Sequence, residues 1–168
     1  MITRAYCVMM ARYNRWQNVQ LESCLAHLPD AELTQDRGAF FGSIMTTLSH
    51  LCWGDHIWLS RFDGGDGPPV PASEHGQYAG SLAAWRPLRD MLDQRIADWA
   101  DGVTDDVLAG DLIWYSGLNQ CDMRTPMAQA ATHFFNHQTH HRGQIHAMIT
   151  STGAKAPVSD LAFMPEEF

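Results

Sequence analysis

Basic residues are scarce in this sequence: 11 lysines and arginines stand against 19 aspartates and glutamates, so the formal net charge is -8 at pH 7. A surface of that sign repels phosphate backbones and anionic lipids. No apolar run approaches the roughly 20 residues that a membrane-spanning helix needs. The opening stretch MITRAYCVMMARYNRW lacks the uninterrupted apolar segment of a signal peptide. We therefore expect a cytoplasmic protein that binds neither nucleic acid nor membrane.

Cysteine and glutamate are also scarce. The four cysteines are scattered, with no C-x-x-C pair, which is typical of reduced thiols rather than of a disulfide framework. Only five glutamates occur and no E-x-x-H, so the carboxylate-bridged di-iron site of ferritin-like bundles cannot be built. The absence of H-E-x-x-H excludes a zincin, and the motifs G-x-S-x-G, P-loop and G-x-G-x-x-G are missing too.

Histidine is what the sequence has in excess. Nine occur, and five of them lie within residues 133–146, interleaved with core-type residues rather than run together as in a tag. The 168 residues are 45% apolar and 18% charged, which suits a soluble globular protein. We expect one domain covering residues 1–168.

Apolar residues recur every three or four positions in four segments, which predicts four helices. We place them at about 2–28, 39–62, 81–100 and 125–151. Helices of this length joined in sequence form an antiparallel bundle by default. The predicted fold class is therefore all-α, an antiparallel four-helix bundle.

Proline and glycine mark the ends of these segments. Pro29 ends the first helix, and a Gly- and Pro-rich loop follows the second. Thr125 and Pro126 suit the cap and first position of the fourth helix, and Gly153 suits its C-terminal cap. Residues 112–115 favour strand before a turn, so we expect a small hairpin between the third and fourth helices. The tail from residue 156 is expected to be irregular.

The fourth helix offers two imidazoles on one face. At about 100° per residue, His137 and His141 differ by only about 40° and one turn of rise, and both fall in the apolar stripe that faces the core. His133 and His140 flank that stripe and are expected at its rim, whereas His146 lies on the outer, solvated face. Two buried imidazoles would otherwise need polar partners in an apolar setting. The pair therefore predicts two ligands of one metal ion.

A third ligand has to come from another helix, and His50 is the best placed. It lies in the middle of the second helix, where Thr47 and Gly54 share its face and leave room for another ligand or a substrate. Taken alone, an inward histidine is more often a core residue with one hydrogen bond. The remaining candidates lie in the Gly/Pro loop, at a frayed helix end, or facing away into solvent: His75, His27 and His56.

Three stretches resemble the DinB family, also called the DinB/YfiT-like metalloenzymes: ARYNRWQN (11–18), RGAFFGSIMTTLSHLCWGDHIWLSRF (37–62) and HFFNHQTHHRGQIHAM (133–148). The resemblance covers nearly the whole chain. It implies an up-down-down-up bundle, a homodimer, and a metal site with one histidine from the second helix and an H-x-x-x-H pair from the fourth. These match His50, His137 and His141.

The resemblance also implies a chemistry, because the family includes thiol-dependent transferases and isomerases that use mycothiol, bacillithiol or glutathione. Our first hypothesis is a metal-dependent thiol S-transferase or isomerase in detoxification or stress response. A metal-dependent hydrolase, and a non-enzymatic metal- or ligand-binding stress protein, are the alternatives. Hydrolysis usually needs a carboxylate base, and Asp55 is badly aimed for that role, which favours thiol transfer.

Three neutral histidines leave open positions on one divalent ion, for which zinc or nickel is expected, with iron or manganese as further candidates. The expected partners are a small-molecule substrate and a low-molecular-weight thiol. Metal should be lost below roughly pH 6, where histidine is protonated. No catalytic group is identified beyond the ligands. Four further residues are candidates for the pocket wall, with core packing or a surface salt bridge as the structural alternative: Tyr13, Asn14, Trp16 and Arg142.

Overall fold

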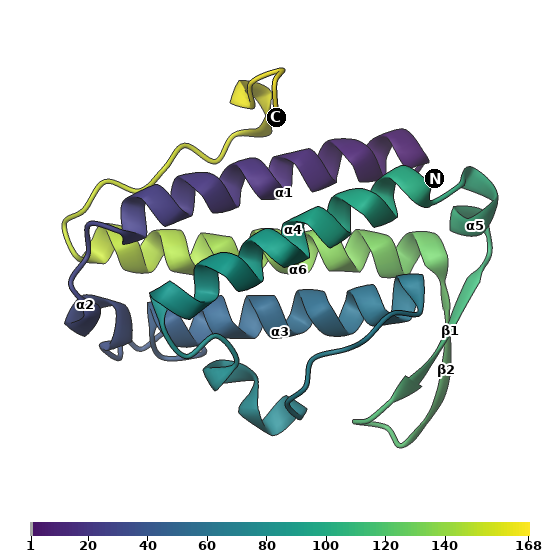
Figure 1. Ribbon diagram of the computed structural model, residues 1–168, viewed down its shortest axis with the longest axis horizontal. Coiled ribbons are helices and arrows are strands. Elements are labelled where there is room, and N and C mark those ends of the chain that lie inside the picture. Colours follow the sequence, from purple (N-terminus) through teal and green to yellow (C-terminus); the bar gives the residue numbers. More distant parts are fainter. Residues whose placement is uncertain (1) are drawn as a thin grey trace.

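Four long helices carry the fold of residues 2–168, the part of the chain that the computed structural model describes. Figure 1 shows α1 and α6 running in one direction and α3 and α4 in the other, which is the up-down-down-up course. The all-α bundle predicted from the sequence is confirmed. The helices are α1 (Arg4–Leu25), α3 (Ile44–Asp63), α4 (Leu82–Gly102) and α6 (Met127–Ser151).

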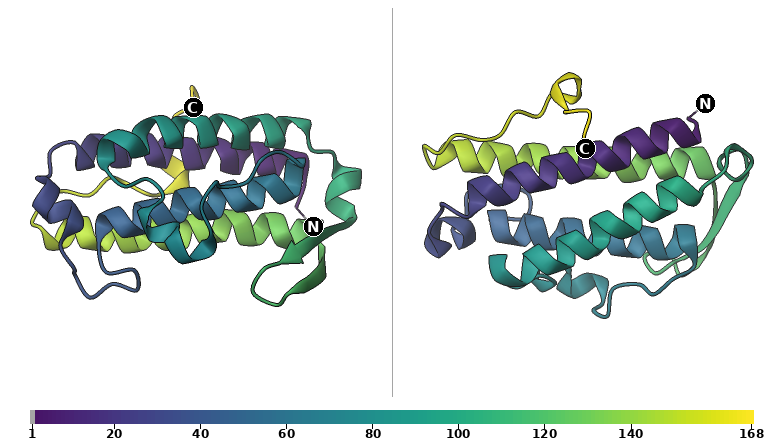
Figure 2. Two further views of the ribbon diagram at one scale, coloured as in Figure 1. Left: turned by 60° about the horizontal axis from the view of Figure 1, so that its bottom comes forward. Right: turned by 45° about the horizontal axis from the view of Figure 1, so that its top comes forward.

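The connections follow from these directions. Because α3 and α4 are neighbours that run the same way, residues 64–81 must return along the bundle, and their 3-10 helix η1 (Ala72–Gln77) packs against α3 (Figure 2). Between α4 and α6 lie the short helix α5 (Asp105–Ala109) and the expected hairpin. Its strands β1 (Asp111–Ser116) and β2 (Cys121–Pro126) pair antiparallel.

Three of the long helices have an N-terminal capping residue with a hydroxyl side chain. Thr3, Ser43 and Ser81 each accept a hydrogen bond from the backbone N–H three residues on, which satisfies one unpaired donor of the first turn. Gly64 ends α3 with a φ of +72°, and Gly153 follows α6 with a φ of +84°, as its predicted capping role requires.

Several predicted boundaries were wrong. The second helix begins at residue 44 instead of 39, because residues 39–42 form a tight turn that Gly42 closes with a φ of +77°. Thr125 does not cap α6: it belongs to β2, and its hydroxyl accepts a hydrogen bond from the Trp114 indole (3.2 Å). The first helix ends three residues early, at Leu25. The periodicity did not reveal α5 or another one-turn helix, α2 (Asp30–Thr34).

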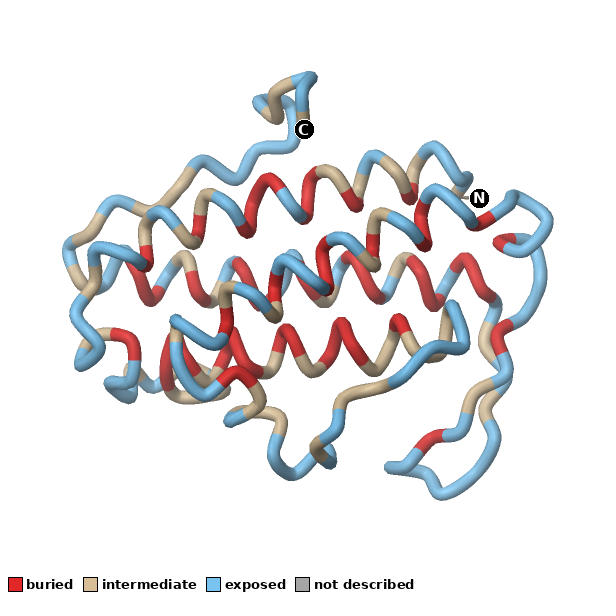
Figure 3. Tube along the Cα trace, in the orientation of Figure 1, coloured by how far each residue is buried: buried red, intermediate tan, exposed pale blue. Residues whose placement is uncertain are grey.

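The core lies between the four long helices, whose inward sides carry the buried residues in Figure 3. Fully burying one large apolar side chain contributes roughly 1.5–3 kcal/mol. No helix within residues 2–168 combines the length and apolar character needed to cross a membrane. The largest fully buried core side chains include Trp85, Phe134, Phe135, Leu92 and Ile96.

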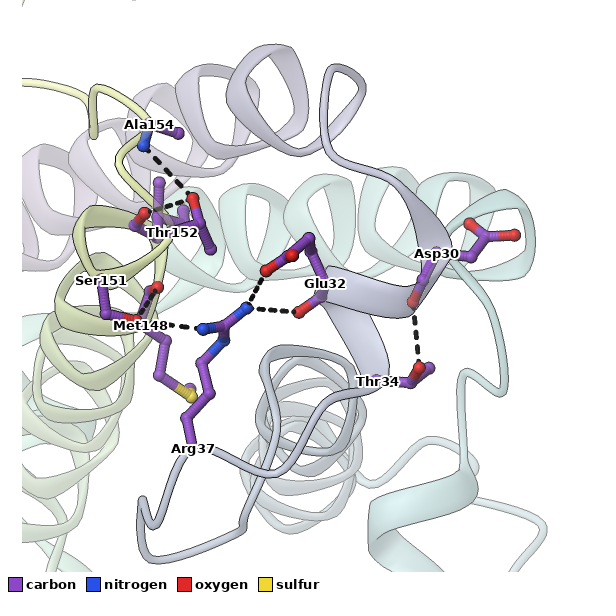
Figure 4. Close-up of polar contacts among 9 residues, drawn as sticks. Asp30, Glu32, Thr34, Arg37, Met148, Ser151, Thr152 and Ala154 are labelled. Atoms are coloured by element: carbon purple, nitrogen blue, oxygen red, sulfur yellow. Dashed lines mark hydrogen bonds and ion pairs between the residues drawn. The ribbon is translucent and has the colours of Figure 1, made fainter.

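Arg37 anchors the loop between α2 and α3 to the far end of α6 (Figure 4). Its guanidinium donates to the Glu32 carbonyl (3.2 Å), pairs with the Glu32 carboxylate, and donates to the Ser151 hydroxyl (3.3 Å). Its backbone N–H donates to the Gly42 carbonyl (2.8 Å). This clamp fixes the turn at residues 39–42, which carries an aromatic side chain to the candidate site.

Candidate metal centre

Three imidazoles meet where α3 packs against α6. His50 comes from α3, and His137 and His141 come from successive turns of α6, so that one ring nitrogen of each lies within 4.8 Å of the others. The Nε2 atoms of His50 and His137 are 3.1 Å apart. Two nitrogens bound tetrahedrally to one zinc ion would lie about 3.3 Å apart. The spacing of the His50 and His137 nitrogens therefore matches that of two ligands of one ion, and the His141 nitrogen is close enough for the three residues to be candidate ligands of a shared ion.

The outer nitrogens of two of these rings have hydrogen-bond partners. His141 Nδ1 lies 2.8 Å from the Gln144 side-chain oxygen, which can only accept, so Nδ1 carries the proton and Nε2 is free. His50 Nδ1 lies 3.1 Å from Nδ1 of His75 on η1, and donation to His75 would leave His50 Nε2 free as well. Such outer partners orient metal-binding imidazoles.

His75 was not selected from the sequence, because the path of the Gly- and Pro-rich loop that contains it cannot be predicted from the sequence. The return segment brings it to within 4.7 Å of the His50 ring, centroid to centroid. A sequence signal exists only in retrospect: the loop is longer than a minimal connection needs. His75 therefore joins the site as a partner of His50.

The absence of a side chain at Gly54 leaves room for the His137 ring. A Cβ built at this position would lie 2.8 Å from His137 Cε1, closer than side chains pack. The glycine, one turn after His50 on α3, thus lets the imidazole of α6 approach the helix backbone. Thr47 is buried one turn earlier, and its hydroxyl donates to the Ser43 carbonyl (2.8 Å).

Phe41 covers the cluster. Its ring centroid lies 4.0 Å from that of His50, 5.3 Å from His141 and 5.1 Å from His75. The sequence prediction placed this residue inside a helix, where it would not have been recognised as part of the site. Phe41 instead comes from the turn that Arg37 anchors, and it contributes an apolar wall.

Burial keeps the three imidazoles neutral. It lowers the pKa of His50 and of His137 to about 3, with further lowering by the neighbouring imidazoles, and it lowers the pKa of His141. Neutral imidazole is the form that binds a metal ion. For an ion held by these histidines, proton competition would therefore begin at a lower pH than the value of roughly 6 expected for ordinary histidines, while the chain stays folded.

The flanking histidines lie at the rim, on the same helix. The His133 ring is 5.8 Å from His137, and the His140 ring is 4.9 Å from His141, centroid to centroid. Burial and the nearby charge of Arg61 lower the pKa of His133. Both rings thus extend the imidazole surface beyond the three converging nitrogens.

Two histidines predicted to be solvated are not. His56 is buried, with Nδ1 2.6 Å from the Tyr78 hydroxyl. His146 is half-buried, and its Nε2 lies 3.1 Å from the carbonyl oxygen of Pro157 in the C-terminal segment. Both predictions failed because their partners come from segments outside the four helices. His27 is exposed, as expected at the end of α1.

The remaining pocket candidates lie on the α1 side of α6. Tyr13 and Arg142 line a cavity of about 300 Å³ beneath the C-terminal segment, and Trp16 packs against Tyr13. Asn14 is buried and accepts a hydrogen bond from Arg142. A second cavity, of about 500 Å³, is lined mainly by residues of α3, α4 and α5 and by none of the three histidines.

A buried polar network behind the histidines joins the four long helices. Asp55 accepts hydrogen bonds from Arg89 (2.6 Å) and from the Gln138 amide (3.0 Å). Arg89 also pairs with Asp93 at 3.1 Å. Asp93 in turn accepts from two side chains of α1, Asn14 and Asn18. The network fixes α6 against α3 and α4 at the level of the histidine pair.

The fold and these contacts define a four-helix bundle with a candidate three-histidine metal centre. The family model described as DinB family matches residues 1–167, and the chain belongs to that family. Protein DinB of Bacillus subtilis (strain 168) is 24% identical over 165 residues, a match that covers 90% of each chain.

Proposed function

We propose that this protein binds one divalent metal ion through His50, His137 and His141, and that it transfers or isomerises small molecules with the help of a low-molecular-weight thiol. The observation that carries the proposal is the convergence of one nitrogen from each ring within 4.8 Å. Three neutral protein ligands leave further positions open, as in catalytic rather than structural sites. When bound, a dication supplies acidity, so that a thiol ionises near neutral pH. We expect zinc or nickel.

The surroundings of the three histidines favour thiol chemistry over hydrolysis. A hydrolase usually needs a carboxylate as general base. Asp55, the nearest carboxylate on α3, is 1% exposed and is already bonded to Arg89 and Gln138. The Phe41 ring, 4.0 Å from the His50 ring, presents an apolar surface to a thiol or an electrophile. We propose a role in detoxification or stress response, as the family resemblance implies.

The first experiment is the metal content of the untagged protein, measured by inductively coupled plasma mass spectrometry after metal-supplemented expression. We expect about one metal ion per chain in the wild type. His50→Ala, His137→Ala and His141→Ala should each lose it, whereas His146→Ala, on the far side of α6, should keep it. A wild type without metal would overturn the proposal.

Turnover separates the remaining functions. The metal-loaded protein should conjugate electrophiles such as chlorodinitrobenzene with one of several thiols (glutathione, cysteine or bacillithiol). Ester hydrolysis without thiol would favour the hydrolase, and bound metal without turnover across the panel would favour a binding protein. Light scattering tests the homodimer, which remains a prediction from the family resemblance.

A further inference from the structure

Arg61 is a half-buried cation without an anionic partner. Its guanidinium carbon lies 4.5 Å from the ring centroid of Trp58, one turn earlier on α3, and 4.0 Å from that of Trp114 in β1. Within residues 2–168 it forms no ion pair and donates no hydrogen bond to an oxygen. Burial lowers the pKa of Arg61 to about 10, with no carboxylate near enough to oppose the shift.

The other arginines of similar or greater burial differ from Arg61 in this respect. Each of them has an oxygen on the chain with which it forms a hydrogen bond or an ion pair: Arg12, Arg37, Arg86, Arg89, Arg95 and Arg142. Stacking on indole rings fixes the plane of a guanidinium while leaving its edge N–H groups free. Arg61 is therefore oriented and charged, and no oxygen of residues 2–168 accepts a hydrogen bond from its guanidinium.

Arg61 also lies in line with the candidate metal centre. Gly54, which faces His137, is seven residues earlier on α3, which places Arg61 on nearly the same helix face and about 10 Å further along. On the facing helix the His133 ring lies 5.8 Å from His137 and 5.0 Å from the Trp58 ring. A continuous row of rings thus leads from the three histidines to Arg61.

We propose that this row binds the substrate or thiol used at the metal centre, that this ligand carries a carboxylate, and that Arg61 binds the carboxylate. The inference rests on the proposed function in one respect: the end of the ligand opposite the carboxylate is taken to react at the metal centre. A guanidinium matches a carboxylate with two parallel hydrogen bonds, and the rings of His133 and Trp58 accept the apolar part between the two ends. In a chain of net charge -8, such a local cation is what an anionic ligand requires.

The first arm of the test uses cobalt-loaded protein, in which a thiol at the metal produces a charge-transfer absorption band. The probes are mercapto acids of 3, 6 and 11 carbons and the mercapto alcohols of equal length. In the wild type, the acid of suitable length should bind about tenfold more tightly than its alcohol, as expected for a charge-assisted pair. Arg61→Met, which keeps the apolar stem, should abolish this preference, and Arg61→Lys should retain part of it.

Arg124→Met is the matched control, because it removes the same charge from the hairpin at an exposed ion pair with Asp111. It should keep the wild-type preference. Equal melting temperatures and equal cobalt content establish that the Arg61 variants are folded and loaded.

The second arm uses tryptophan fluorescence to compare 4-phenylbutyrate with 4-phenylbutanol, in metal-free and in loaded protein. An Arg61-dependent preference for the acid here would assign the carboxylate to the electrophile rather than to the thiol. Absence of a charge-transfer band with every thiol would overturn the proposed function without deciding this second arm. Equal binding of acids and alcohols in both arms, or a preference that survives Arg61→Met, would overturn the inference.

Discussion

Gly54 and His137 fit together at the scale of single atoms. Substituting Gly54→Ala adds a methyl group 2.8 Å from His137 Cε1, so the ring must move away from His50. We expect the affinity for metal, measured by competition with a chelator, to fall by at least about tenfold. Removing a group that orients a metal ligand has an effect of that size, and a displaced His137 ring is likewise badly oriented. The fold should survive, because alanine favours the helix over glycine by about 1 kcal/mol.

Gly143→Ala provides the comparison for this prediction. Gly143 lies inside α6, and nothing is within 4 Å of a Cβ at that position. The variant should keep its metal affinity and gain up to about 1 kcal/mol of stability. Wild-type metal affinity in Gly54→Ala would show that the ring does not need its present position.

Helical periodicity brought His50, His137 and His141 into consideration together, because each lies on a long helix whose buried face can be read from the sequence. Their ring nitrogens do converge. Phe41 and His75 could not be found in this way. Both reach the cluster from connections whose paths depend on distant contacts, such as the pairing of Arg37 with the end of α6. The three histidines on the buried faces of long helices could be predicted, whereas the two residues that reach the cluster from loops could not.

At the scale of helices, Arg89 joins α4 to α3 and also pairs with its own helix at Asp93. Arg89→Met would leave two buried carboxylates, at 1% and 5% exposure, without their cation. Removing one partner of a buried pair costs about 3–5 kcal/mol. We expect a loss of that size in the free energy of unfolding, measured by urea denaturation of the metal-free protein.

The exposed pair on the hairpin gives the contrast. Arg124 and Asp111 are 69% and 39% exposed, and Arg124→Met should cost less than about 1 kcal/mol. Similar losses in the two variants would mean that the buried network does not hold α3 and α4 together.

Helix ends could be predicted where a local capping residue sets them, and the predictions were wrong where contacts with distant residues set them. The ends at Gly64 and Gly153 follow from glycine's left-handed φ. Threonine followed by proline is an equally strong signal for the start of α6. In the structure, however, Thr125 pairs in the hairpin and accepts a hydrogen bond from the Trp114 indole, so it does not cap the helix. Local capping preferences are worth only about 1 kcal/mol, which a hairpin ladder and an indole hydrogen bond together can outweigh.

For the whole molecule, the cluster of neutral histidines links stability to pH. Burial lowers the pKa values of His50 and His137 to about 3 in the folded chain, against an ordinary value of about 6.5 when unfolded. Between these values the unfolded chain binds more protons, so the free energy of unfolding must fall as pH decreases from about 6.5 towards 3. Above about 6.5 both states are neutral and the effect vanishes.

Each histidine can contribute a slope of at most about 1.4 kcal/mol per pH unit. Asp93, whose pKa is raised by burial, acts in the opposite direction, so the measurement compares variants that all retain Asp93. Urea denaturation of the chelator-treated wild type, from pH 7.5 to 4, should give a steeper decline than His50→Gln/His137→Gln. His27→Gln, exposed at the end of α1, is the control. Parallel curves for the wild type and the double variant would mean that the folded chain admits protons to the cluster as readily as the unfolded chain does, so that burial is not what keeps His50 and His137 neutral.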